Sequence, residues 1–318
     1  MHDIAFPLLY STTRVISSTI IPGPLTSILE TGLTPLKTSY LSHIKKLHVN
    51  WSVRRETHFQ QHPPTLSLPR LVTVRVKNLP YCFIDGCGLL GNITPHTFIY
   101  EHDIMDHLGS CAAFDVKLIP PSVRKIIYLS PVPAHTLPPT ALDVPNTIPH
   151  IEQTVFIFIP RDQTGYYGID VTLKEGYRYP PDRNRTMLVH MFAYHIYKTD
   201  APVLIVGLES FPRECRPNDV TWITDEDEVA LAFEREIKAR LEMVYSRDGY
   251  HPAELLAQWA EHPGTRHLNM LKKIKGITVM SLKRYVREES RQDEISQEEA
   301  EEWTRVSLHR AGKREIRG

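Results

Sequence analysis

Leu71-Val72-Thr73-Val74-Arg75-Val76 is the stretch of sequence that best indicates the fold. Apolar residues stand at its first, fourth and sixth positions, and β-branched residues dominate it, as is typical of a strand with one buried face. The same pattern recurs in three other stretches, which are Ile44-x-x-Leu47-x-Val49, Ala113-x-x-Val116-x-Leu118 and Val203-x-x-Val206-x-Leu208. We therefore expect these four stretches to form strands, together with two further apolar runs at residues 123–129 and 155–159.

The pattern is the L-x-x-L-x-L phrase of leucine-rich repeats, in which alternate residues point into a stacked core. The four stretches begin at residues 44, 71, 113 and 203, so their intervals are 27, 42 and 90 residues. Regular leucine-rich repeats recur roughly every 20 to 29 residues. A buried strand of a parallel sheet matches so short a phrase equally well. Both interpretations predict an α/β protein, either an irregular leucine-rich-repeat-like fold or a largely parallel sheet with crossover helices.

Helices are expected between the strands at residues 97–108 and 183–198. The second of these lies between the strands at 155–159 and 203–208, which predicts a β-α-β unit with parallel strands. Beyond residue 220 the sequence becomes helical, with Thr224 as the expected N-cap before a run of four acidic residues. A short strand is expected at 277–280, and further helices at 252–260, 281–286 and 296–309.

These elements predict three regions along the chain. Residues 1–220 form a strand-rich, repeat-like α/β region, and residues 221–290 form a helical closing region of the same domain. Residues 291–318 form a charged helical tail, in which glutamates precede arginines as the helix dipole favours.

Composition excludes several classes of protein. The 318 residues include 37 lysines and arginines against 37 aspartates and glutamates, so the chain lacks the basic excess of a general nucleic-acid-binding protein. Four cysteines without paired C-x-x-C spacing indicate reduced thiols. No secretory leader and no apolar run of about 18 residues are found, which predicts an intracellular protein of the cytoplasm or nucleus without a membrane span.

The glycine-rich stretch Gly86-Cys87-Gly88-Leu89-Leu90-Gly91 has the G-x-G-x-x-G spacing of a dinucleotide-binding loop. Such a loop must open directly into a helix, whose first amide groups bind the pyrophosphate. Pro95 follows closely and disfavours helix at Thr94. An ordinary loop is therefore the preferred interpretation, and a nucleotide-binding enzyme is kept as the alternative.

Metal-ligating and redox-active residues are also weak candidates. His102-Asp103-x-x-Asp106-His107 would place two histidine–aspartate pairs on a helix, but no other region supplies further ligands. His190 and His195 are five residues apart and so lie on different helix faces. Cys82 and Cys87 could be redox-sensitive if exposed. The sequence therefore predicts no catalytic, cofactor-binding or metal-binding residues and no cofactor.

The chain resembles the region that follows the F-box in basidiomycete fungal F-box and leucine-rich-repeat-like proteins. The resemblance is carried by Phe6-Pro7-Leu8-Leu9-Tyr10, by Leu41-Ser42-His43-Ile44-Lys45-Lys46-Leu47-His48-Val49, by Ala201-Pro202-Val203-Leu204-Ile205-Val206-Gly207-Leu208-Glu209-Ser210 and by Ile277-Thr278-Val279-Met280-Ser281-Leu282-Lys283-Arg284-Tyr285. It implies the substrate-recognition part of a ubiquitin-ligase receptor. Binding to the ligase adaptor would need an F-box before Phe6, which is not evident in the sequence.

The function predicted from the sequence is a non-enzymatic protein-binding module for an unidentified protein partner, with neither nucleic acid nor membrane as its target. Two alternatives remain open. The first is the nucleotide-binding enzyme with its loop at residues 86–91, and the second is a non-functional paralogue.

Overall fold

The computed structural model describes residues 12–16, 43–50, 68–77, 93–101, 119–132, 150–160, 181–211, 216–217, 225–247, 251, 253–288 and 294–315. The chain divides into two compact units. The first unit contains residues 1–129 and 143–154, and the second contains residues 130–142 and 155–318. The described strands pair in parallel and are combined with helices, so the protein has an α/β fold with crossover helices.

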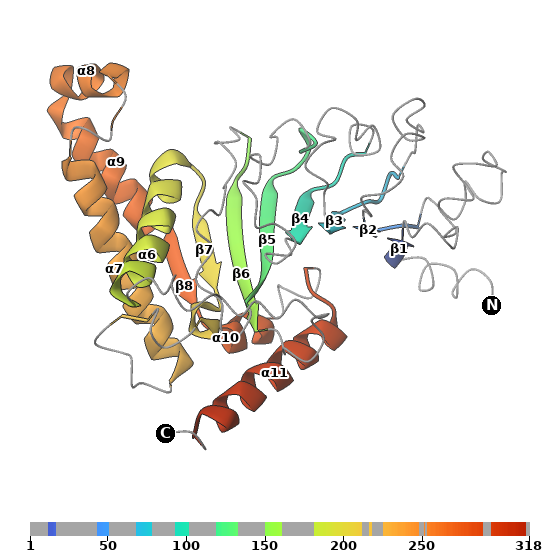
Figure 1. Ribbon diagram of the computed structural model, residues 1–318. Coiled ribbons are helices and arrows are strands. Elements are labelled where there is room, and N and C mark those ends of the chain that lie inside the picture. The colour runs from blue at the N-terminus through green and yellow to red at the C-terminus, as the bar shows by residue number, and fades with distance from the viewer. Residues whose placement is uncertain are drawn as a thin grey trace, which may run out of the picture. The chain divides into compact units, whose positions relative to one another are not determined.

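The first unit is built on parallel strands that pair in the order of the sequence (Figure 1). Each strand pairs with the next without a register shift, so residues at equivalent positions form rows across the sheet. The strands are β1 (Thr12–Ile16), β2 (Lys46–Asn50), β3 (Thr73–Lys77), β4 (Thr97–Glu101) and β5 (Lys125–Val132).

From β2 onward the strands begin at nearly constant intervals. β2 to β5 begin at residues 46, 73, 97 and 125, and β6 (Gln153–Pro160), most of which belongs to the second unit, begins at 153, so the intervals are 27, 24, 28 and 28 residues. The interval from β1 to β2 is longer, at 34 residues. The intervals from β2 onward lie within the range of roughly 20 to 29 residues that is typical of leucine-rich repeats. The intervals inferred from the sequence are uneven because the strands β4 and β5 were not recognised as examples of the L-x-x-L-x-L pattern.

The predicted helix at residues 97–108 is wrong over its first five residues, which form β4. Thr97, Phe98 and Tyr100 favour a strand by their β-branched and aromatic side chains, and pairing with β3 and β5 provides the backbone partners. The predicted strand at 113–118 lies outside the described residues. The predicted strands at 44–49, 71–76 and 123–129 are confirmed by β2, β3 and β5, each of which begins two residues later than predicted.

The core of the first unit is a row of side chains that the register places side by side. Leu47, Val74, Phe98 and Ile126 are register partners on successive strands, and each is at most 2% exposed. A second buried row comes from the residue two positions before each strand, at Ile44, Leu71 and Val123. Together these rows follow the first and fourth positions of the repeated phrase.

In the second unit, β6, β7 (Val203–Val206) and β8 (Ile277–Met280) follow one another in the sheet (Figure 1). Helix α6 (Pro181–Lys198) connects β6 to β7, as the predicted β-α-β unit requires. Phe192 of α6 packs edge-on against Phe156 and Phe158 of β6, with ring centroids 5.4 and 5.8 Å apart. The predicted strands at 155–159 and 277–280 are confirmed by β6 and β8, whereas the strand predicted at 203–208 is confirmed over residues 203–206 only, because Leu208 begins a 3₁₀ helix.

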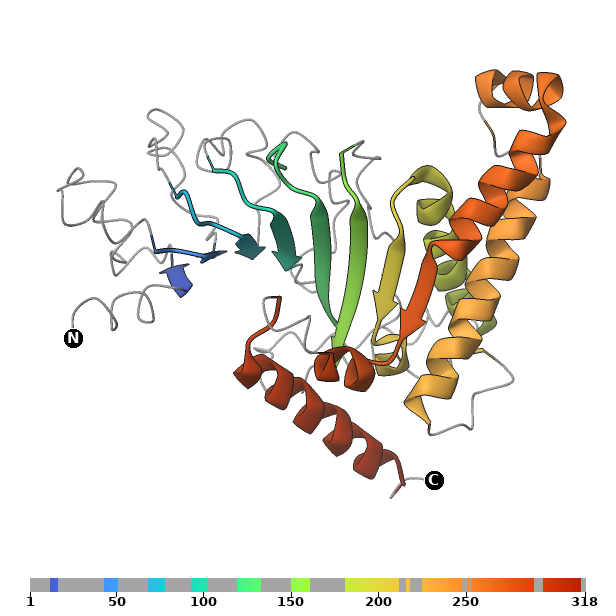
Figure 2. The same ribbon diagram turned by 180° about the vertical axis from the view of Figure 1, so that it is seen from behind.

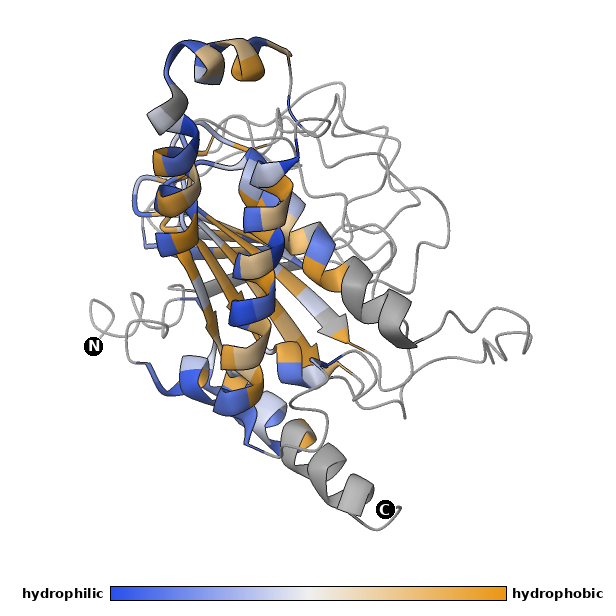
Figure 3. Ribbon diagram, turned by 90° about the vertical axis from the view of Figure 1, so that its left-hand side faces the viewer, coloured by the Kyte–Doolittle hydropathy of each residue, from blue (hydrophilic) through white to orange (hydrophobic). Residues whose placement is uncertain are grey.

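The remaining helices complete the second unit. Helix α7 (Glu226–Ser246) contacts α6 and β8, while α8 (Ala253–Glu261) and α9 (Pro263–Lys275) lead into β8. Figure 3 shows the strands mostly apolar and the helices mixed in hydropathy, as expected of helices that cover a sheet. The 3₁₀ helix η5 (Leu208–Ser210) follows β7, and α10 (Leu282–Arg287) and α11 (Gln297–Glu315) complete the chain. Figure 2 shows α8 and α10 at opposite ends of the unit.

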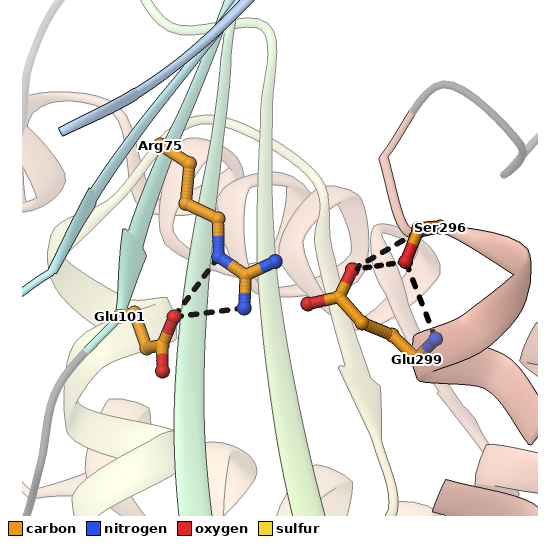
Figure 4. A network of polar contacts seen from close by, with 4 residues as sticks. All are labelled: Arg75, Glu101, Ser296 and Glu299. Atoms are coloured by element: carbon orange, nitrogen blue, oxygen red, sulfur yellow. Dashed lines mark hydrogen bonds and ion pairs between the residues drawn. The ribbon is translucent and has the colours of Figure 1, made fainter. Parts of the chain in front are cut away.

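Polar side chains define where these helices begin. Asp225, and not the predicted Thr224, is the N-cap of α7, because its carboxylate accepts hydrogen bonds from the backbone N–H groups of Asp227 and Glu228. Ser281 caps α10 as predicted, accepting from the Arg284 N–H. Ser296 and Glu299 form a reciprocal capping box at the start of α11 (Figure 4). Among the described residues, no helix combines the length and apolar composition needed to cross a membrane.

Candidate functional site

The repeated strands of the first unit carry a row of outward side chains at the position directly before each strand. We call it the pre-strand row. Its members share one register position and follow a buried or half-buried residue. They are Lys45, Val72, His96, Arg124 and Glu152.

The backbone of this row is held by one hydrogen-bond pattern that repeats at each strand. The carbonyl of Lys45 accepts from the N–H groups of Val72 and Thr73, at 2.8 and 3.0 Å. The carbonyls of Val72, His96 and Arg124 accept in the same way from the next row member and the residue after it, at distances between 2.7 and 3.3 Å. The spacing between successive side chains is therefore fixed by the sheet itself.

Short turns bring the chain to this position. The Leu71 N–H donates to the Leu68 carbonyl at 3.1 Å, and the Val123 N–H donates to the Pro120 carbonyl at 3.0 Å. The Ser122 hydroxyl also donates to the Pro95 carbonyl of the preceding repeat at 2.8 Å. Because these turns bury the residue before the row, the row member itself must point outward.

The row is accessible and mixed in chemistry. Lys45, His96 and Glu152 are exposed, and Val72 is 42% exposed, which is unusual for a large apolar side chain. Arg124 Nε lies 3.6 Å from the carboxylate of Glu152, and Arg124 Nη1 also donates to the Pro121 carbonyl. The row thus presents two cations, an imidazole, a carboxylate and an apolar side chain on a hydrogen-bonded backbone.

An ion pair links two strands of the same unit. Arg75 of β3 contacts Glu101 of β4 through both Nε and Nη2, which lie 3.0 and 2.7 Å from Glu101 Oε2 (Figure 4). Both side chains are mostly buried, at 11% and 16% exposed. Charge-assisted contacts of this kind fix the relative position of neighbouring strands as well as adding stability.

A second polar cluster lies in the second unit, at the carboxyl end of β7. Glu209 is 5% exposed, and burial raises the pKa of its carboxyl to about 8. Its Oε1 accepts from the Leu282 N–H at 2.7 Å, while its backbone carbonyl accepts from Arg216 at 2.9 Å. Nearby, the Ser281 hydroxyl donates to Asp227 at 2.6 Å. These contacts join η5, α7 and α10, so the polar groups of this cluster are explained by their role in holding the three helices together.

The two histidines of α6 have separate surroundings, as their spacing predicts. His190 Nδ1 accepts from Arg240 of α7 at 3.2 Å, and burial together with the neighbouring arginines lowers its pKa. His195 packs edge-on against Phe156 at 5.1 Å, and burial lowers its pKa to about 3. The two rings therefore do not converge on one ligand.

The other candidate residues of the sequence cannot be placed. The stretch 86–91, the residues His102, Asp103, Asp106 and His107, and the cysteines Cys82 and Cys87 all lie outside the described residues. Within the part of the chain that the structure describes, no group of three or more histidine, cysteine, aspartate or glutamate side chains is arranged to hold a metal ion.

The pre-strand row was not predicted from the sequence because the regular interval between successive strands was not recognised. The signal was present, since Ile44, Leu71, Pro95 and Val123 precede four row members and are buried. At β4, however, proline and aromatic residues stand where the phrase has aliphatic ones. The phrase Pro95-x-x-Phe98-x-Tyr100 was therefore not recognised as the same repeat.

No protein-family model, curated protein or solved structure matches this chain.

Proposed function

We propose that the chain is a non-enzymatic protein-binding module, and that the pre-strand row contacts the partner. The observation that carries this proposal is the row itself, in which Val72 is 42% exposed between charged and polar neighbours on a hydrogen-bonded backbone. Partner-binding surfaces commonly combine an exposed apolar contact with a polar rim. Rigidity lowers the entropy lost on binding.

Recognition of substrates for a ubiquitin ligase is one form that this function could take, given the resemblance to F-box and leucine-rich-repeat-like proteins. The strand intervals of 24 to 28 residues support a repeat architecture of that kind. Stacked repeats present extended rows of side chains, which suits the binding of a polypeptide more than the enclosure of a small molecule.

Site-specific photo-crosslinking tests the proposal. A photoreactive phenylalanine derivative is placed at Val72 in one sample and at Leu231 of α7 in another, because Leu231 is also apolar and is 55% exposed. In native extract we expect discrete adducts at position 72 that unlabelled wild-type protein competes away. Equal labelling at both positions, or labelling at 72 that resists competition, would show that the row is not a binding surface.

A further inference from the structure

Charge is unevenly distributed between the strands of the first unit and the rest of the chain. Among the described residues of that unit, lysine and arginine occur eight times, whereas glutamate occurs twice and aspartate does not occur. The described residues of this unit are its strands and the turns directly before them. The whole chain, by contrast, has equal numbers of basic and acidic residues. The strands and their preceding turns therefore form a local basic region.

Several of these cations are accessible around the pre-strand row. Lys45 and Arg70 are exposed, and the side chain of Arg124 is 38% exposed. Exposed His96 lies between Val72 and Arg124 in the row. The acid of the row, Glu152, lies beside Arg124, so a peptide carboxylate that contacts Arg124 shares this guanidinium with Glu152.

We infer that the partner presents an acidic peptide segment, which lies extended across the pre-strand row with two acidic residues four positions apart and an apolar residue midway. This inference rests on the proposed function and names the chemistry of the partner. Neighbouring strands are about 4.8 Å apart, so Lys45 and Arg124 are separated by about 14 Å. In an extended peptide, residues i and i+4 point to the same side and are also about 14 Å apart.

The apolar residue of the peptide follows from the same geometry. Residue i+2 of an extended segment faces the same side as residues i and i+4 and lies halfway between them. At that point the row presents Val72 and His96. An aliphatic side chain there covers the exposed Val72, while its acidic neighbours lie opposite the two cations.

A nucleic acid fits this row less well. Binding of single strands relies on aromatic side chains that stack on bases, and the pre-strand row contains none apart from the imidazole of His96. An exposed valine offers nothing to a phosphate backbone. The balanced charge of the whole chain also reduces the long-range attraction of a polyanion.

Fluorescence anisotropy with short labelled probes tests the inference. The probes are a Glu-Ser-Leu-Ser-Glu peptide, the Lys-Ser-Leu-Ser-Lys peptide with its charges reversed, and an oligodeoxythymidine. We expect the wild-type chain to bind the acidic peptide in preference to both others, with an affinity that falls as salt rises. Equal binding of the charge-reversed peptide, or stronger binding of the oligonucleotide, would overturn the inference.

Matched variants locate the binding site. The double variant Lys45→Glu with Arg124→Glu should weaken binding of the acidic peptide by about tenfold or more. The double variant with glutamine at both positions should weaken this binding by less. Lys272→Glu with Lys275→Glu on α9 reverses two exposed charges elsewhere and should change affinity less than about twofold. Circular dichroism of each variant establishes that it is folded. Equal losses in both charge-reversed variants would mean that the row is not the site.

The two proposals fail in different ways. Protein adducts at position 72 in native extract, combined with no preference for the acidic peptide, would overturn the acidic partner and leave the binding function in place. Absence of both adducts and peptide binding would overturn both.

Discussion

Glu209 Oε1 accepts a hydrogen bond from the Leu282 backbone N–H at 2.7 Å, which links the 3₁₀ helix after β7 to the first turn of α10. Glu209 Oε2 is buried and has no hydrogen-bond partner among the described residues. Because burial raises the pKa of this carboxyl from 4.5 to about 8, the folded protein keeps it protonated at neutral pH. At neutral pH the carboxyl that makes this contact is therefore neutral, although the N–H group by itself favours the ionised form.

This raised pKa makes stability depend on pH. The unfolded chain releases the proton near pH 4.5, whereas the folded chain releases it near pH 8. Between these values the folded state binds more protons, so the contribution of Glu209 to stability is complete below pH 4.5 and declines as pH rises to about 8. Relative to Glu209→Gln, we expect the wild type to lose about 3 kcal/mol of unfolding free energy between pH 5.5 and 7.5. Urea denaturation of both proteins measures the difference. A difference that stays constant with pH would show that Glu209 ionises normally.

His195 predicts the opposite dependence. Its Nε2 is buried without a hydrogen-bond partner among the described residues, and burial, with Lys273 and Lys198 nearby, lowers its pKa from 6.5 to about 3. Its contribution to stability is complete above pH 6.5 and is lost as pH falls towards 3. Relative to His195→Phe, the wild type should lose up to about 2 kcal/mol between pH 6.5 and 5. Thermal or urea unfolding at the two pH values tests this, and His190→Phe serves as a comparison at a more exposed position.

Gly207 is required by the backbone after β7. Its φ is +81°, and a Cβ at this position would lie 2.2 Å from the Phe158 carbonyl oxygen. Gly207→Ala should therefore destabilise the protein by about 2 kcal/mol or more. Gly264→Ala is the matched control, because no atom lies within 4 Å of its added Cβ in α9. It should be neutral or stabilise by up to about 1 kcal/mol. Similar melting temperatures for both variants would contradict the strain at Gly207.

Lys273 connects α9 to the end of α6. Its Nζ donates to the carbonyls of Tyr197 and Thr199 at 2.7 and 2.5 Å and lies 3.3 Å from the Asp200 carboxylate. A cation at this position satisfies the last carbonyls of a helix and interacts well with its dipole. Lys273→Met should lower the unfolding free energy by about 2 kcal/mol. The neighbouring Lys272→Met removes an exposed lysine and should change it by less than about 0.5 kcal/mol. Equal effects would mean that the contacts of Lys273 add no net stability.

The spacing of apolar residues along the chain predicted most of the strands and helices in which that spacing is regular. It failed where a strand-like and a helix-like spacing compete in the same stretch. Thr97 to Glu101 precedes a stretch with helical spacing and was assigned to it, although its own residues favour a strand. Helix α9 was not predicted, and two of its apolar residues, Leu268 and Leu271, are 64% and 37% exposed in the structure. Tertiary contacts support it instead, among them Arg266 Nε on the Tyr245 carbonyl at 2.7 Å. The candidate site could not be predicted from local pattern either. The pre-strand row exists only where the strands pair in register, and that pairing depends on tertiary contacts.

The sequence alone determined the α/β class, because buried strands and amphipathic helices follow from the spacing of apolar residues along the chain. It also determined the capping of α10 by Ser281, which depends only on residues a few positions apart. The tertiary structure decided the rows across the sheet and the protonation of Glu209. These depend on residues that are distant in sequence, and their positions and burial arise only when the chain folds.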